Sequence, residues 1–146
     1  MSLECKYQEA VDVIGPRQSA FEAAERMHQR TVGALVVVDN SHSPIGIVTD
    51  RDLTVRVMAA GLDPQTTAVG EVMTPAPTTA QTAITVETAL AIMQAGEFRR
   101  LPLVNALGHL AGIITLDDIV MSLSKQFVSV KKVLEEEIPA AAAKVR

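Results

Sequence analysis

Hydrophobic and polar residues follow one pattern that occurs twice in this chain. Each copy has apolar residues spaced i, i+3, i+4 and i+7, then two short β-branched runs, then a second helical stretch. The first spacing is typical of one face of an amphipathic helix, and the short runs are typical of buried strands. The apolar helix positions are Ala20, Ala23, Ala24 and Met27 in the first copy and Val86, Ala89, Leu90 and Met93 in the second.

A constant offset relates the two copies. Thr115 minus Thr49 gives 66, and at that offset eight of the 31 positions from Ala23 to Leu53 are identical without a gap. Average composition would give roughly two identities by chance. We therefore interpret the chain as one supersecondary unit used twice.

The repeat predicts an α+β fold in which each unit reads strand, helix, strand, strand, helix. The expected strands are 10–14, 35–38 and 45–48 in the first unit and 78–80, 101–104 and 110–114 in the second. A unit of about 60 residues is marginal alone. We therefore expect repeat 1 (8–66) and repeat 2 (67–124) to pack as one compact module with pseudo-twofold symmetry.

Local signals indicate where the helices begin and end. Ser19 with Glu22 three residues later forms a capping box, and Gly61 suits the C-cap of the second helix. In the connection between the units, a short helix with one apolar face precedes Pro75 and Pro77, which exclude a long helix.

The last stretch, 125–146, is predicted to be a helical tail. Its apolar residues share one helical face, whereas most of its charged residues lie elsewhere. These apolar residues are Phe127, Val130, Val133, Leu134 and Ile138. We expect Pro139 to end the helix and the apolar face to pack on a partner subunit.

Composition restricts the classes of partner. With 48% hydrophobic and 21% charged residues, the chain suits a globular protein with an aliphatic core. A net charge of −4 gives no basic field for a polyanion, so nucleic acid is not an expected partner. The single cysteine, Cys5, the lack of a signal peptide and the lack of a membrane-length apolar run predict a cytoplasmic protein without a membrane partner.

The sequence offers no catalytic set. It contains no Ser/His/Asp arrangement, nucleophile elbow, phosphate-binding Walker loop or dinucleotide glycine fingerprint. His28, His42 and His109 are scattered, with no cysteine or carboxylate at ligand spacing. We therefore expect neither an enzyme nor a metal site, and no required cofactor.

Candidate binding chemistry lies where a strand of each unit meets the helix that follows. Thr49 and Thr115 stand at these corners, and Asp52 and Asp118 follow three residues later. A Thr among the free N–H groups of a helix start suits a phosphate, and the Asp can accept hydrogen bonds from ribose hydroxyls. The alternative needs no ligand, because Thr-x-x-Asp is also a capping box. The short Asp favours the ligand, since capping boxes prefer Glu or Gln.

These residues resemble the signature of the CBS domain, named for cystathionine β-synthase. The signature is a glycine, two apolar residues, Thr or Ser, two variable residues and Asp, here GIVTDRD from Gly46 and GIITLDD from Gly112. The upstream helix with Ala and Met, and the strand that begins FRRLPLV at Phe98, also fit. The two units resemble a CBS pair, or Bateman module, of the small standalone bacterial type that includes hypoxic response proteins.

The resemblance implies a regulatory module that senses a ligand. Members of this family bind adenosine compounds in clefts between the repeats, usually form homodimers, and regulate attached or partner proteins. We therefore expect AMP, ADP, ATP or S-adenosylmethionine as a regulatory ligand, a homodimer, and an effector protein as partner. The alternative is a ligand-free dimerisation or interaction scaffold.

The family layout also assigns positions around the ligand. It makes Thr49, Asp52, Thr115 and Asp118 the first contacts. It places Ile14 and Ile47, and in the other half Ala80 and Ile113, along an apolar slot for adenine. Each of these apolar residues can equally be a plain core residue.

Three arginines complete the predicted site. The resemblance suggests that Arg99 and Arg100 reach phosphates in the cleft, for which the planar guanidinium is well suited. The alternative is a pair of surface charges at a strand entry. Arg51 is replaced in the second unit by Asp117, next to Asp118, so phosphates would be repelled there unless an arginine lies close. We therefore expect two clefts that are not equivalent.

Overall fold

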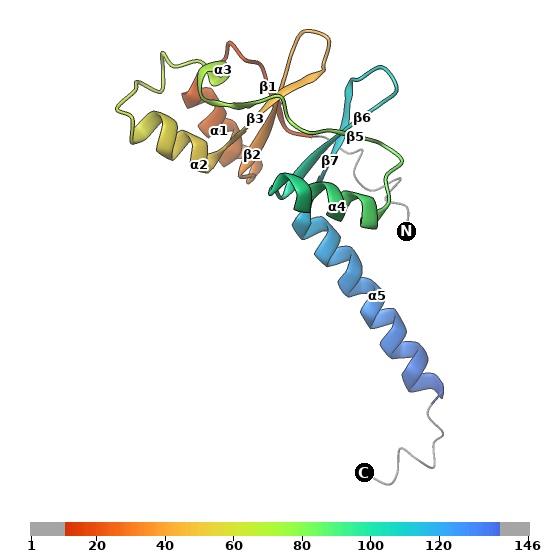
Figure 1. Ribbon diagram of the computed structural model, residues 1–146. Coiled ribbons are helices and arrows are strands. Elements are labelled where there is room, and N and C mark those ends of the chain that lie inside the picture. The colour runs from red at the N-terminus through yellow and green to blue at the C-terminus, as the bar shows by residue number, and fades with distance from the viewer. Residues whose placement is uncertain (1–10, 138–146) are drawn as a thin grey trace. The chain divides into compact units, whose positions relative to one another are not determined.

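The computed structural model describes residues 11–137 and contains two compact units, divided between Ile114 and Thr115 (Figure 1). Within residues 11–137, the strands lie in the first unit, apart from Thr115 at the end of the last strand. The second unit contains one long helix. Cys5, Ala10, Ile138 and Pro139, which the sequence analysis named, lie outside the described residues.

The first repeat folds around a four-stranded sheet. Its elements are β1 (Val13–Ile14), α1 (Ala20–Arg30), β2 (Ala34–Val38), β3 (Pro44–Thr49), α2 (Asp50–Leu53) and the π-helical turn η1 (Thr54–Met58). Two further elements follow, α3 (Val69–Val72) and β4 (Thr74–Pro75). The strand order is β1-β2-β3-β4, with β1 parallel to β2 and the other neighbours antiparallel.

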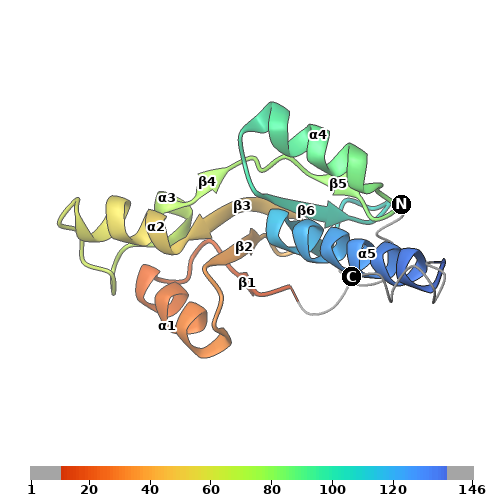
Figure 2. The ribbon, with the colours of Figure 1, turned by 90° about the horizontal axis from the view of Figure 1, so that it is seen from below.

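The second repeat uses the same order of elements around a three-stranded sheet. It comprises β5 (Ala80–Gln81), α4 (Val86–Gly96), β6 (Arg100–Val104) and β7 (Leu110–Thr115). The strand order is β5-β6-β7, and β5 is parallel to β6 as β1 is to β2. Figure 2 shows α1 and α4 beside their own sheets. The predicted α+β fold with two copies of one unit is confirmed.

Aliphatic side chains form the core of the first repeat. Ala20, Ala23 and Met27 of α1 pack with Leu35, Val37 and Val48 of the sheet, all nearly inaccessible to solvent. The equivalent residues of α4, Val86, Ala89 and Met93, are also buried. Ala24 differs from the prediction, because it is exposed on α1.

Two other points differ from the prediction. The first strand of repeat 2 begins at Ala80 rather than Thr78. Strand β4 was not expected at all, yet it pairs with β3 through Gly46 and Ile47. A methyl group on Gly46 would lie 2.3 Å from the Met73 sulfur, so this glycine makes room for the neighbouring chain.

The second unit contains α5 (Leu116–Glu137), a continuous helix of 22 residues. The sequence predicts a boundary at residue 124, between the last helix of repeat 2 and a separate helical tail. No residue interrupts the helix there, because Ser124 and its neighbours carry neither the Gly nor the Pro that would end it. None of the described helices is both long and apolar enough to cross a membrane.

The capping box predicted at Ser19 is confirmed and should contribute to stability. The Ser19 hydroxyl accepts from the Glu22 N–H at 3.1 Å, and the Glu22 carboxylate accepts from the Ser19 N–H at 2.7 Å. Ser19→Ala should lower the free energy of unfolding by about 1 kcal/mol, measured by urea denaturation. Ser129→Ala, which removes an exposed hydroxyl bonded within α5, is the control and should have little effect.

The same box predicts a pH dependence. The hydrogen bond from the Ser19 N–H holds the pKa of Glu22 below its ordinary value. Because the folded pKa is depressed, this stabilisation is present above the unfolded pKa and is lost as pH falls through the folded pKa. Glu22→Gln should therefore flatten the pH dependence of unfolding at acidic pH. An unchanged dependence would show that Glu22 does not titrate in this way.

Candidate functional site

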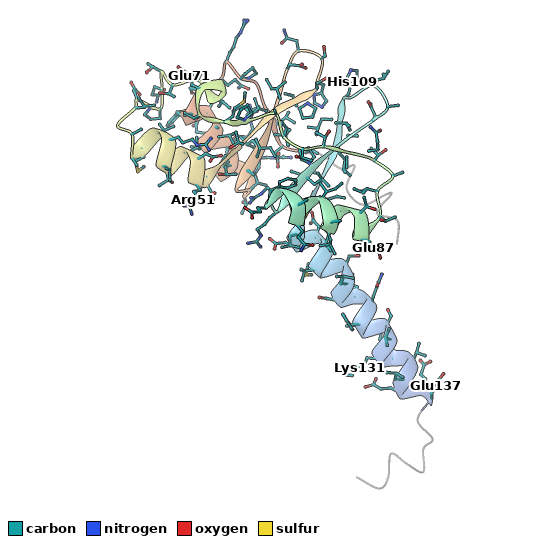
Figure 3. All side chains as sticks on the ribbon, viewed as in Figure 1. Arg51, Glu71, Glu87, His109, Lys131 and Glu137 are labelled. Atoms are coloured by element: carbon teal, nitrogen blue, oxygen red, sulfur yellow. The ribbon has the colours of Figure 1, made fainter. Side chains whose placement is uncertain are left out.

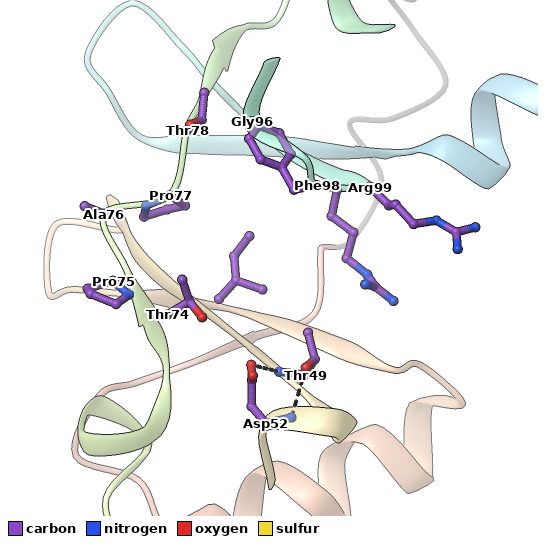
Figure 4. A pocket seen from close by; sticks show the side chains of 12 residues that line it. Thr49, Asp52, Thr74, Pro75, Ala76, Pro77, Thr78, Gly96, Phe98 and Arg99 are labelled. Carbon is purple, nitrogen blue, oxygen red and sulfur yellow. Dashed lines mark hydrogen bonds between the residues drawn. The ribbon is translucent and has the colours of Figure 1, made fainter. Parts of the chain in front are cut away.

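A cavity of about 400 Å³ opens within the first unit and is lined by residues from both repeats (Figure 4). Repeat 1 contributes Ile47 and Thr49 of β3 and Asp52 of α2, and repeat 2 contributes the segment from Phe98 to Arg100. The chain from Thr74 to Thr78 forms another wall. The volume lies within the range of small-molecule sites in proteins.

Thr49 and Asp52 are held in a reciprocal capping box at the corner between β3 and α2. The Thr49 N–H donates to Asp52 Oδ2 at 2.9 Å, and the Asp52 N–H donates to Thr49 Oγ1 at 3.2 Å (Figure 4). The short Asp side chain therefore makes a complete box, so its length does not by itself argue for a ligand. Asp52 Oδ1 also lies 3.7 Å from the Arg56 guanidinium.

The N–H groups at this corner are not free for a phosphate, contrary to the expectation from sequence. The Asp50 N–H donates to the Gly33 carbonyl at 3.0 Å, and the Arg51 N–H donates to the Asp50 carboxylate at 2.8 Å. The Asp52 N–H is used by the cap. Any anion in this cavity must therefore be held mainly by side chains.

Arg100 is the side chain best placed for that role. It is half-buried, lines the cavity, and its guanidinium makes no hydrogen bond or ion pair with any residue in 11–137. A methyl group on Gly33 would lie 3.8 Å from Arg100 Nη2 and 3.2 Å from Asp50 Oδ2. The glycine in repeat 1 thus leaves space in which an arginine of repeat 2 approaches the Thr49 corner.

Phe98 supplies an aromatic wall that the sequence analysis did not assign. Its ring lines the cavity and packs over Gly96, where a methyl group would lie only 2.0 Å from the ring. Figure 4 shows Phe98 and Arg99 on one side of the cavity and Thr49 and Asp52 on the other. The signal that could have found Phe98 is a glycine two residues before an aromatic at a strand entry.

The other predicted site residues lie elsewhere. Ile14 is 1% exposed and belongs to the hydrophobic core, the alternative left open for it. Ala80 and Ile113 are half-buried on β5 and β7 and do not line this cavity, and neither does the exposed Arg51. Ile47, by contrast, does line it.

Thr115 and Asp118 form the matching capping box at the start of α5. The Thr115 N–H donates to Asp118 Oδ2 at 2.9 Å, and the Asp118 N–H donates to Thr115 Oγ1 at 3.1 Å. The duplicated motif therefore has the same local geometry in both copies.

Residues 11–137 contain no group of three or more His, Cys, Asp or Glu side chains that could hold a metal ion.

Comparison with known proteins identifies two CBS domains, at residues 8–59 and 69–125. The chain is 37% identical over 112 residues to the CBS domain-containing protein YhcV of Bacillus subtilis, covering 77% of this chain and 78% of that protein. It is 29% identical over 118 residues to hypoxic response protein 1 of Mycobacterium tuberculosis, covering 81% and 82%.

Some relatives are much longer. Identity to the uncharacterized protein MK0525 of Methanopyrus kandleri is 36% over 110 residues, 74% of this chain and 56% of that protein. The chain thus spans about half the length of that relative, and 14% of the meiotically up-regulated gene 70 protein of Schizosaccharomyces pombe.

Solved structures share the fold. A crystal structure of hypoxic response protein I with two coordinated zinc ions has a TM-score of 0.74 at 27% identity, covering 83% of this chain and 98% of that one. A structure of CBSX2 in complex with AMP has a TM-score of 0.70 at 26% identity, covering 82% and 92%.

The capping role of Asp52 can be tested without any ligand. Asp52→Ala leaves the half-buried Thr49 N–H without its acceptor and should lower the free energy of unfolding by about 1 kcal/mol in urea denaturation. Asp52→Asn keeps an acceptor oxygen and should cost less. Equal losses for the two variants would show that charge, rather than the hydrogen bond, matters at this corner.

Proposed function

The chain belongs to the family of CBS-domain proteins as a CBS pair, and from this premise we propose that its cavity binds an adenine nucleotide as a regulatory ligand. AMP, ADP and ATP are the first candidates, and S-adenosylmethionine is the next. Binding would be read by an effector protein in the cytoplasm. No cofactor and no catalytic step belong to this proposal.

One observation carries the proposal. A single cavity combines a hydroxyl and a carboxylate of repeat 1 with the guanidinium of Arg100, which has no partner within residues 11–137, beside an aromatic ring. These groups match the parts of a nucleotide: hydroxyl-bearing sugar, anionic phosphate and flat base. The AMP complex of the similar protein CBSX2 supports the same ligand class.

The capping box does not prevent Thr49 and Asp52 from contacting the sugar. A hydroxyl that accepts one hydrogen bond still has its own proton to donate, and a carboxylate has acceptor sites on both oxygens. Asp52 uses Oδ2 for the cap, which leaves Oδ1 to accept from a ribose hydroxyl. The cap orients the two side chains before the ligand arrives.

The phosphate would lie against Arg100, and the base against Ile47 and the Phe98 ring. A bidentate contact between guanidinium and phosphate is a strong, charge-assisted pair. A flat base gains by stacking on an aromatic face. Because the contacts come from both repeats, the ligand would favour one packing of the repeats over others, which is the basis of a regulatory signal.

Two further points limit the proposal. The zinc of the hypoxic response protein structure is not carried over to this chain, because residues 11–137 show no group of ligands for it. Thr115 and Asp118 remain proposed ligand contacts on the resemblance to the family alone. The same holds, separately, for Arg51, Ala80 and Ile113.

A second candidate function is a scaffold that works without a ligand. Exposed apolar side chains favour it, among them Phe21, Met58 and Leu62 around α1 and η1. Large exposed apolar patches often mark protein interfaces. A homodimer is compatible with both functions, so the ligand test decides between them.

Thermal unfolding should distinguish the two functions. A ligand that binds only the native state adds about 2.7 kcal/mol of stability at 100 times its Kd. The melting temperature of the purified chain should therefore rise with at least one of AMP, ADP, ATP and S-adenosylmethionine at millimolar concentration. No rise with any of them would reject the proposal in favour of the scaffold.

Two variants connect the shift to this cavity. Arg100→Gln should remove most of the shift produced by phosphate-bearing ligands, whereas Arg17→Gln, an exposed arginine outside the cavity, should leave it unchanged. Asp52→Glu can still cap the helix but places its carboxylate differently, so it should keep the unliganded melting temperature and lose the shift. A full shift in both cavity variants would place the ligand elsewhere.

A further inference from the structure

Helix α5 exposes a row of large apolar side chains. Phe127 is 75% exposed, Leu134 57%, Val130 55% and Val120 52%. A helix of this length normally gains its stability from packing an apolar face against another surface. The row therefore indicates an interface.

The spacing of the row indicates the kind of surface that covers it. Six of the ten apolar residues of α5 alternate between steps of four and three, which is a seven-residue repeat. They are Leu116, Val120, Leu123, Phe127, Val130 and Leu134, of which Leu116 and Leu123 are half-buried. This average step of 3.5 residues is the period at which two helices keep one seam in contact along their whole length. A helix lying on a sheet or a globular surface needs no such period.

We infer that α5 pairs along this seam with α5 of a second copy, and that the two helices run antiparallel. The helix is self-complementary in that direction about a twofold axis at Lys125. Leu116 then meets Leu134 of the second copy, and Val120 meets Val130 of the second copy. Leu123 meets Phe127 of the second copy, and by symmetry each contact occurs twice.

The residues beside the seam also match in the antiparallel direction. Asp117 faces Lys131 of the second copy, which places opposite charges together at both ends. Between them, Ser124 faces its own equivalent across the axis. Lys131 lies 3.6 Å from Glu135 on its own helix, an exposed pair that is weak enough to exchange.

The parallel direction is disfavoured by Glu137. It occupies the next seam position after Leu134, so two parallel helices would bring a pair of carboxylates together in the interface. In the antiparallel pair, Glu137 would lie opposite position 113 of the second copy. That position precedes Leu116, the first residue of α5, so Glu137 lies beyond the last apolar contact. Figure 3 shows Lys131 and Glu137 near the end of the helix.

Distances between nitroxide labels test this inference on the full chain. Cys5→Ser removes the native thiol, and Lys125→Cys or Lys132→Cys then places one label on the face away from the seam. With one label per chain, any dipolar coupling is between copies. In the antiparallel pair the labels at 125 lie level, whereas those at 132 are offset along the axis by roughly 21 Å, 14 residues at 1.5 Å each.

The expected result is a clearly longer distance at 132 than at 125, without added nucleotide. Phe127→Glu should abolish the coupling at 125, and Ser129→Glu, the same change on the outer face, should preserve it. Equal distances at the two positions would indicate parallel helices and overturn the inference. Absent coupling, or coupling unaffected by Phe127→Glu, would also overturn it, showing that another surface covers the row. None of these outcomes depends on ligand binding, so the proposed function is tested separately.

Discussion

The hydrogen bonds between Thr49 and Asp52 determine how the candidate site can work. They fix the corner at which β3 passes into α2. They also use backbone N–H groups that would otherwise attract an anion at a helix start. The corner therefore offers a hydroxyl and a carboxylate, the groups proposed to contact the sugar, but no free backbone N–H groups for an anion. Negative charge on a ligand has to be balanced from the other repeat, which makes the site dependent on both halves of the pair.

The positive charge that could balance an anionic ligand comes from a sequence difference between the repeats. Gly33 and Ala34 stand where the second repeat has Arg99 and Arg100. The missing side chain at Gly33 leaves the space into which Arg100 reaches, close to Asp50. An arginine at position 33, the equivalent of Arg99, would fill this space and bring a second positive charge close to Arg100. The duplicated unit thus gives the symmetric fold, and its departures from symmetry give the site its chemistry.

The sequence predicted the fold well because the repeat supplied two independent readings of one pattern. The order of elements and most of the buried residues of α1 and α4 followed from periodicity, and the Ser19 cap followed from the spacing of Ser19 and Glu22. Strand β4 was missed because a two-residue strand beginning at Thr74 carries no periodic signal, and it forms only through pairing with β3. The continuity of α5 across residue 124 was not predicted, because the boundary was placed by the extent of the repeat and not by a helix-ending residue.

The site was predicted less completely, for a physical reason. Sequence identifies residues that suit a ligand, but it does not show which of their groups are already bonded. The N–H groups beside Thr49 were taken as free, although Gly33 and the side chain of Asp50 satisfy two of them. Phe98 was passed over because its role depends on packing against Gly96 and on the course of the chain from Thr74 to Thr78.

The two Thr-x-x-Asp caps are followed by helices of very different length, because α5 is continuous. After Asp52 the chain continues for only one short helix and a π-helical turn, so the Thr49 cap orients a local corner. After Asp118 the same helix continues to Glu137, so the Thr115 cap fixes the first helical residue of the entire seam. Helical phase is conserved along an unbroken helix, at 3.6 residues per turn. The phase of Phe127 and Leu134 along α5 is therefore fixed from the Thr115 cap onward. A single duplicated motif orients the proposed ligand contacts in one repeat and the proposed helix-pairing face in the other.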